Sequence, residues 1–181
     1  GQGLLAIPGT TLRSAQVDIL MGTLSKTLGS CGGYLVGSQP FIDYLRYTLP
    51  GFVYSVGLSP PLAASARAAL HLLIKEPQRV ETLRQRSRQI WEGCKRQGLP
   101  LGTSEATPVI PIILGDSAAC TRICAGLAER GIQVKPIVYP AVEESAARLR
   151  FFMSSEHTPE QVDHSLMALG ELLGVGVLPH K

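Results

Sequence analysis

The chain has 181 residues and a mass of 19.4 kDa, with 45% hydrophobic residues, 17% charged residues and a formal net charge of +3. This length and composition exclude an intrinsically disordered chain and are sufficient for a packed core. The net charge is too small for a protein that binds nucleic acid mainly through phosphates. No apolar run reaches the ~18 residues of a membrane span, and the start of the chain lacks the pattern of a signal peptide and resembles a cut end.

The four cysteines, Cys31, Cys94, Cys120 and Cys124, form no C-x-x-C motif. Their number is too low for a secreted disulfide scaffold, and their spacing does not match a zinc site. We therefore expect reduced cysteines that serve in packing, no bound metal, and a cytoplasmic location.

Two short apolar segments near the start of the chain predict buried strands on either side of a glycine-rich loop. Residues 17–21 form the first segment, and residues 34–36, bracketed by glycines, form the second. The loop between them carries Lys26. Because two strands cannot close a core in so short a segment, we expect this part to dock on a surface outside the chain.

Two helices are predicted to follow these strands. Apolar residues recur at every fourth position within residues 40–49, which indicates a short amphipathic helix. Residues 60–75 are rich in Ala and Leu and begin with two prolines, which suit a first helical turn. The dipeptide Glu76-Pro77 ends this pattern and marks a boundary between two parts of the chain.

The second part predicts an α+β layer, in which three strands are covered by helices. Asp116 can cap one helix, and Thr158 to Gln161 has the pattern of a capping box with Pro159 at the first helical position. The predicted elements are a helix over 78–97, a strand over 108–114, a helix over 117–131, strands over 132–138 and 149–153, and a helix over 159–174.

The predicted helix over residues 78–97 is strongly basic, with six Arg and Lys residues against two Glu residues. A solvated helix on the surface of the domain explains this charge most simply. A phosphate-rich ligand such as coenzyme A is the alternative.

Lys26 stands directly after a predicted strand, in a loop of glycine and hydroxyl residues. Glycine lets the backbone approach a ligand closely, and a desolvated lysine favours the neutral amine that forms a Schiff base. The hydroxyls of Thr23 and Ser25, with backbone N–H groups, could hold a phosphate. A surface lysine in a glycine-rich turn is the alternative, and neither phosphate-binding pattern G-x-x-x-x-G-K-[ST] nor G-x-G-x-x-G is present.

The segment over residues 21–34 resembles the lysine motif of the α-oxoamine synthases, which are pyridoxal-phosphate (PLP) enzymes with the fold of aspartate aminotransferase. The resemblance runs from Val17 to Leu173. It includes Pro50-Gly51-Phe52-Val53-Tyr54-Ser55, Pro108-Val109-Ile110-Pro111, Gly131-Ile132-Gln133-Val134, Tyr139-Pro140, Arg148-Leu149-Arg150-Phe151 and His157-Thr158-Pro159-Glu160-Gln161.

The resemblance implies roles for individual residues. Lys26 would form the Schiff base with PLP, with Thr23 at its phosphate. Ser55 would reach across a dimer to the neighbouring phosphate, although this chain has Val56 where many relatives carry a second hydroxyl residue. Arg150 would bind the carboxylate of the amino acid through its guanidinium fork. Without the resemblance, Arg150 would be interpreted as a solvent-facing or structural residue.

The implied fold class is α/β, as the C-terminal part of a PLP enzyme of fold type I. Residues 1–76 would end the large PLP-binding domain, and residues 77–181 would form the small α+β domain. In the family, a carboxylate for the pyridine nitrogen and a ring-stacking histidine lie upstream of the lysine. Only 25 residues precede Lys26, and they contain one acidic residue, Asp18, and no histidine. We therefore expect the C-terminal half of such an enzyme, which is not a competent catalyst by itself.

The implied activity is an acyl transfer in which an α-amino acid condenses with an acyl thioester of coenzyme A or a carrier protein, with decarboxylation to an α-aminoketone. A homodimer is expected, with no membrane span and no nucleic acid partner. Two alternatives stay open: an aminotransferase or lyase of the same fold, and a non-catalytic half that serves in dimerisation or docks with a missing N-terminal half. We expect a structural role for His157, because it precedes the capping box.

Overall fold

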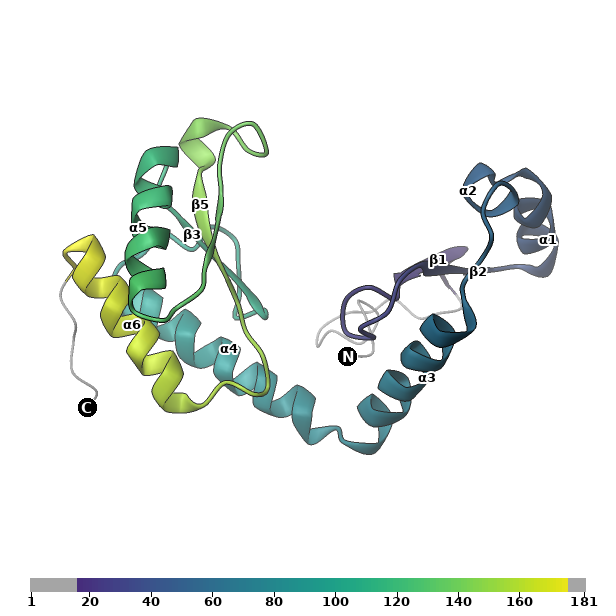
Figure 1. Cartoon of the computed structure of the whole chain (residues 1–181), viewed down its shortest axis with the longest axis horizontal. Coiled ribbons are helices and arrows are strands. Elements are labelled where there is room, and N and C mark those ends of the chain that lie inside the picture. Colours follow the sequence, from purple (N-terminus) through teal and green to yellow (C-terminus); the bar gives the residue numbers. More distant parts are fainter. Residues whose placement is uncertain (1–15, 176–181) are drawn as a thin grey trace. The chain divides into compact units, whose positions relative to one another are not determined.

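The computed structural model describes residues 16–175 and divides the chain into two compact units, residues 1–77 and residues 78–181 (Figure 1). We call them the N-terminal unit and the C-terminal unit. The N-terminal unit contains β1 (Ile19–Thr23), β2 (Gly33–Gly37), α1 (Gln39–Thr48), α2 (Pro50–Val53) and α3 (Pro60–Lys75). The C-terminal unit contains α4 (Gln78–Arg96), β3 (Val109–Ile113), α5 (Ser117–Glu129), β4 (Lys135–Ile137), the 3-10 helix η3 (Glu144–Ala146), β5 (Arg148–Phe152) and α6 (Pro159–Leu173).

The N-terminal unit is built on an antiparallel hairpin of β1 and β2, in which Met21 pairs with Leu35. Both predicted strands and the predicted helices α1 and α3 are confirmed, with bounds that differ by at most a few residues. The single-turn helix α2 was not predicted. Its first residue, Pro50, stands where a proline fits the start of a helix.

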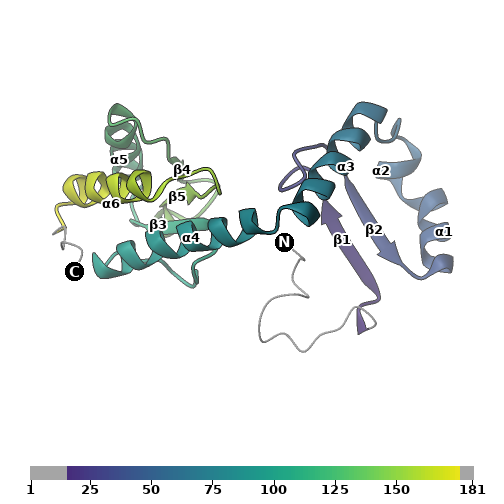
Figure 2. The same ribbon diagram turned by 90° about the horizontal axis from the view of Figure 1, so that it is seen from below.

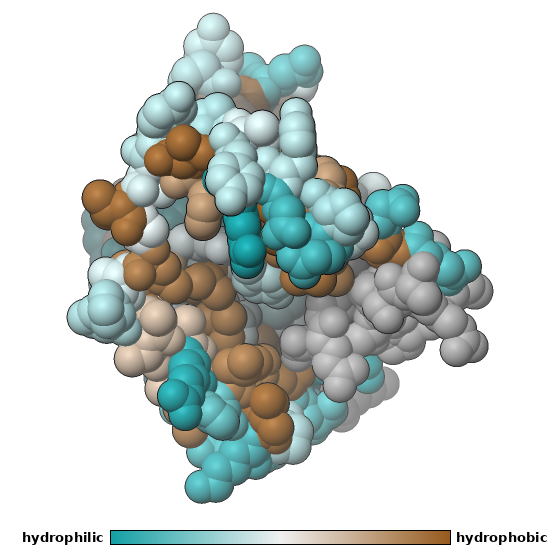
Figure 3. All heavy atoms as spheres, turned by 90° about the vertical axis from the view of Figure 1, so that its right-hand side faces the viewer, coloured by the Kyte–Doolittle hydropathy of each residue, from teal (hydrophilic) through white to brown (hydrophobic). Residues whose placement is uncertain are grey.

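The predicted burial of β1 and β2 is wrong for the described residues. Met21 is 72% exposed and Val36 is 54% exposed, and within the described part of this unit Ala66 alone is buried. A two-stranded hairpin has too few neighbours to cover its own side chains. Figure 3, which faces the N-terminal unit, shows hydrophobic residues at the surface.

The C-terminal unit is a three-stranded antiparallel sheet of order β3-β5-β4, covered by helices on one face (Figures 1 and 2). The alternation of helices and strands along the chain is as predicted, although β4 is shorter than expected. The backbone N–H of Ile132 donates to the carbonyl of Leu127 at 2.9 Å, so this residue closes the end of α5 and does not extend the strand.

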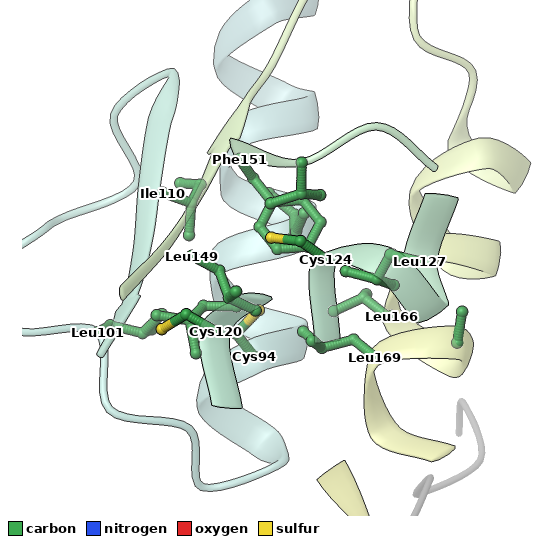
Figure 4. Packing of buried hydrophobic residues seen from close by; sticks show 14 of the residues in the cluster. Cys94, Leu101, Ile110, Cys120, Cys124, Leu127, Leu149, Phe151, Leu166 and Leu169 are labelled. Carbon is green, nitrogen blue, oxygen red and sulfur yellow. The ribbon is translucent and has the colours of Figure 1, made fainter. Parts of the chain in front are cut away.

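One core joins the helices to the sheet (Figure 4). Ile110 and Ile112 of β3 and Leu149 of β5 are fully buried against α4, α5 and α6. Burial of such apolar side chains is the main stabilising contribution in a domain of this size. The C-terminal unit therefore has a closed core, which the described residues of the N-terminal unit do not form.

The predicted helix caps are confirmed. Asp116 accepts a hydrogen bond from the backbone N–H of Ala119 at 2.8 Å. At α6, the Thr158 hydroxyl accepts from the N–H of Gln161, and the Gln161 side chain accepts from the N–H of Thr158. These contacts satisfy backbone donors that would otherwise have no partner at a helix start.

The predicted packing role of the cysteines is confirmed for Cys94, Cys120 and Cys124, which lie in the core, whereas Cys31 is exposed. Burial raises the pKa of the Cys94 thiol to about 12 and that of Cys124 to about 11. These thiols stay protonated at neutral pH. In the described part of the chain, no three His, Cys, Asp or Glu side chains form a group that could hold a metal ion. The described helices include none that is long and apolar enough to cross a membrane.

The core predicts that substitutions at two nearby positions of α6 change the free energy of unfolding by very different amounts. Leu169 is 1% exposed and Met167 is 50% exposed. We expect L169A to lower the free energy of unfolding by about 2–5 kcal/mol, because it leaves a cavity. M167A, the matched control, should change it by less than about 1 kcal/mol. Urea denaturation followed by circular dichroism measures both, and equal losses would contradict the assigned packing.

Candidate cofactor and substrate site

The loop that carries Lys26 closes the β1–β2 hairpin and has a defined backbone. The N–H of Leu24 donates to the carbonyl of Gly32 at 2.9 Å, and the N–H of Gly29 donates to the carbonyl of Lys26 at 3.0 Å. Gly32 has φ +101°, a conformation that favours glycine. The Ser30 hydroxyl donates to the carbonyl of Leu62 at 2.7 Å and so ties the loop to α3. The Lys26 side chain is exposed at the surface of this fixed loop.

Two of the predicted phosphate contacts lie together beside Lys26. The hydroxyl oxygens of Thr23 and Ser25 are 2.8 Å apart, and the N–H of Ser25 donates to the Thr23 hydroxyl at 3.2 Å. Both residues are exposed. A loop that carries both a lysine amine and a pair of hydroxyls suits a phosphorylated aldehyde, because the amine can react with the carbonyl and the hydroxyls can donate to the phosphate.

Ser55 lies in the segment after α2, apart from this set. Its hydroxyl donates to the carbonyl of Phe52 at 3.3 Å and accepts from the N–H of Gly57 at 3.4 Å. Among the described residues, no hydrogen bond joins Ser55 to Thr23, Ser25 or Lys26. Ser55 and its neighbour Val56 are both exposed, so this segment is accessible to another surface.

The sequence interpretation missed an apolar groove of about 680 Å³ in the N-terminal unit. Met21 and Tyr34 of the hairpin line one side, and Leu45 of α1 and Phe52 of α2 line the other. Thr23 also lines the groove. The four-residue spacing of apolar positions in α1 was its only signal, since the hairpin side depends on the pairing of β1 with β2.

Arg150 lies on the central strand of the C-terminal sheet. Leu149 and Phe151, on either side of it, point into the core, and Arg148 shares its face. The Arg150 guanidinium lies 4.9 Å from the centre of the Phe152 ring, and its Nε atom is shielded from solvent without a hydrogen-bond partner. In contrast, Nε of Arg148 donates to the carbonyl of Ala146 at 2.8 Å.

Both arginines line a cavity of about 360 Å³ on the face of the sheet opposite the core. The other wall comes from the loop over residues 101–107. The residues that line this cavity include no acidic side chain. Uncompensated guanidinium groups in a partly closed space suit a carboxylate ligand.

Glu144 holds the segment that leads into β5. Its carboxylate accepts from the N–H of Ser117 at 2.6 Å and from the Ser117 hydroxyl at 2.5 Å. These hydrogen bonds hold the pKa of the Glu144 carboxyl below its usual range. The carbonyl of Ala147 accepts from the N–H of Leu114 at 2.9 Å, so the segment is tied on two sides just before Arg148.

His157 and the basic helix α4 have structural contacts. The ring Nδ1 of His157 accepts from the N–H of Ser154 at 3.2 Å, and Nε of Arg86 donates to the His157 carbonyl at 3.2 Å. Arg79 forms an ion pair with Glu156 at 2.9 Å. Part of the charge of α4 is therefore used to fix the start of α6.

The chain matches the family model of class I and II aminotransferases over residues 6–169. It belongs to that family. This match begins at residue 6, whereas the resemblance in the sequence begins at Val17. The chain is 39% identical over 173 residues to an 8-amino-7-oxononanoate synthase of Saccharophagus degradans. This alignment covers 96% of the chain and 43% of the relative.

Solved structures agree with this assignment. Serine palmitoyltransferase of Sphingomonas wittichii matches with a TM-score of 0.81 and 31% identity, over 91% of this chain and 42% of that one. A structure of SPT with a PLP internal aldimine matches with a TM-score of 0.81 and 27% identity, over 88% of this chain and 41% of that one. The resemblance to α-oxoamine synthases and the α/β fold of PLP enzymes of fold type I are confirmed, and the chain spans less than half the length of these relatives.

The contact between Glu144 and Ser117 predicts a pH dependence of stability. Because the pKa of Glu144 is lowered in the folded state, its contribution is present above the unfolded pKa of ~4.3 and is lost as pH falls through the folded value. E144Q should therefore be less stable than the unmodified chain at pH 7, and the difference should shrink below about pH 4. Urea midpoints at both pH values measure this. The adjacent control E143Q should show no such trend, and a constant difference for E144Q would contradict the account.

Proposed function

We propose that this chain contributes the lysine and the carboxylate-binding arginine of a PLP-dependent α-oxoamine synthase. The reaction condenses an α-amino acid with an acyl thioester of coenzyme A or a carrier protein, and loss of carbon dioxide gives an α-aminoketone. The observation that carries the proposal is the loop of defined backbone that holds Lys26 together with the paired hydroxyls of Thr23 and Ser25. Relatives named as 8-amino-7-oxononanoate synthase and serine palmitoyltransferase support it.

The residues of the Lys26 loop fit PLP. Lys26 would hold the cofactor through its side-chain nitrogen, and the hydroxyls of Thr23 and Ser25 would bind the phosphate. When bound, PLP supplies an electron sink for negative charge at the α-carbon of the amino acid. The Nζ atom of Lys26 would also accept the α-proton of the amino acid.

Arg150 would bind the carboxylate of the amino acid. Among the described residues, its guanidinium has an unpaired Nε donor and lines a cavity that has no acidic side chain. A fixed carboxylate positions the α-carbon and its proton for reaction. We propose that Glu144 supports this role indirectly, because it ties down the segment that enters β5.

The N-terminal unit needs a further surface to complete it. Its exposed apolar residues and the short length of the chain relative to its relatives support this view. We propose that residues 1–76 belong to the large PLP-binding domain and residues 77–181 to the small domain. The large domain would be completed by a further segment of chain, and a second copy would give a homodimer in which Ser55 contacts the neighbouring phosphate. The free cysteines support a cytoplasmic location.

A chimera tests the reaction. We would replace the matched 173-residue segment of the Saccharophagus degradans enzyme with this chain, add PLP, an amino acid and an acyl-coenzyme A, and follow release of the free thiol. We expect thiol release that needs both substrates. K26A should lower the rate by at least ~10²-fold, because proton transfer and covalent binding are both lost. Circular dichroism checks that each chimera is folded.

Lys75, exposed in the last turn of α3, provides the matched control, and K75A should keep the rate of the parent chimera. Amino-group transfer or cleavage without the thioester would favour the aminotransferase or lyase alternative. A folded chimera with no turnover would favour a non-catalytic docking role.

A further inference from the structure

Two residues that each carry an unpaired polar atom line the same cavity of the C-terminal unit. In the described residues, three buried side-chain atoms lack a hydrogen-bond partner: Oε1 of Gln97, Oγ of Ser104 and Nε of Arg150. Ser104 and Arg150 both line the cavity of about 360 Å³ on the open face of the sheet. Because buried polar groups in native proteins are nearly always paired, two such atoms at one cavity indicate a polar ligand.

The backbone around Ser104 is held in place, so its hydroxyl is the part left without a partner. The indole Nε1 of Trp91 donates to the Ser104 carbonyl at 2.7 Å, and the N–H of Ser104 donates to the carbonyl of Leu101 at 3.3 Å. At the base of the loop, the N–H of Ile113 donates to the carbonyl of Pro100 at 2.9 Å. The loop is therefore anchored to both α4 and β3.

The charge of the cavity determines the class of ligand. Arg148 and Arg150 line it, and no acidic side chain does. A carboxylate can accept about four hydrogen bonds, more than one guanidinium donates to it. A serine hydroxyl on the opposite wall is a suitable further donor.

We propose that Ser104 is a substrate-binding residue whose hydroxyl donates to the same carboxylate that Arg150 binds. This inference rests on the proposed function of Arg150 and adds a second contact from the loop over residues 101–107. Both atoms are shielded from solvent in the structure. Each side chain therefore rotates about its own bonds to meet the ligand, while the anchored backbone stays in place.

The single tryptophan of the chain makes the test direct, because the Trp91 indole gives one N–H signal in a ¹⁵N-labelled sample. We would titrate the full chain with acetate and, as a neutral match, with acetamide. Acetate should shift the Trp91 signal with saturation, and acetamide should not. S104A should weaken acetate binding about 10-fold, as expected for loss of one hydrogen bond to a charged group. S104T, which keeps the hydroxyl, should restore the affinity.

Controls separate binding from structure. The Trp91 signal without acetate should be unchanged in S104A, because its partner is the backbone carbonyl. S165A removes a hydroxyl that already donates to the carbonyl of Gln161, away from this cavity, and should keep the affinity. If R150Q abolishes binding while S104A binds normally, the role of Ser104 is overturned and that of Arg150 stands. If the unmodified chain does not bind acetate, or R150Q binds it equally well, the roles of both residues are overturned.

Discussion

The alternation of side chains along β5 is the constraint on which the C-terminal unit depends. Leu149 and Phe151 point into the core, while Arg148 and Arg150 point to the opposite face. A strand with this period of two can bury one face only, and the helices α4, α5 and α6 cover that face. The other face keeps its cations and receives the loop over residues 101–107 as a wall. The same packing that stabilises the unit therefore places Arg150 at the cavity on the open face of the sheet.

The N-terminal unit combines a defined loop with a largely exposed apolar surface. Its loop is well defined by backbone hydrogen bonds, but its hairpin and helices expose most of their apolar side chains. Local hydrogen bonds therefore fix the backbone of the Lys26 loop although the described residues around it form no closed core. The groove between the hairpin and α1–α2 adds an apolar surface next to Thr23. In the proposed function, a further segment that covers this unit would desolvate Lys26, which favours the neutral amine.

Features that depend on local chemistry were predictable from the sequence. Asp116, the Thr158–Gln161 box and the prolines that begin α3 each act within one helical turn, and their helices begin where expected. The alternation of side chains along a strand likewise puts Arg148 and Arg150, two residues apart, on one face of β5. The motif around Lys26 predicted the proximity of Thr23 and Ser25 because all three lie within four residues.

Features that depend on distant contacts were not predictable. The strands β1 and β2 are exposed because the other described elements of the N-terminal unit do not cover them. An apolar run of residues does not reveal whether other elements will cover it. The cavity between the Ser104 loop and β5 is lined by residues far apart in the chain. The polar composition of the loop is typical of any surface connection. The late start of β4, at Lys135, is set by the hydrogen bond that closes α5, a contact outside the strand itself.

The central claim is that Lys26 is the residue that holds the cofactor. The most direct measurement is to incubate the purified chain with PLP, reduce it with borohydride and map the modified peptide by mass spectrometry. The account predicts that modification is confined to Lys26 and is lost in K26A. Absence of modification, or modification spread equally over Lys75, Lys95 and Lys135, would contradict it.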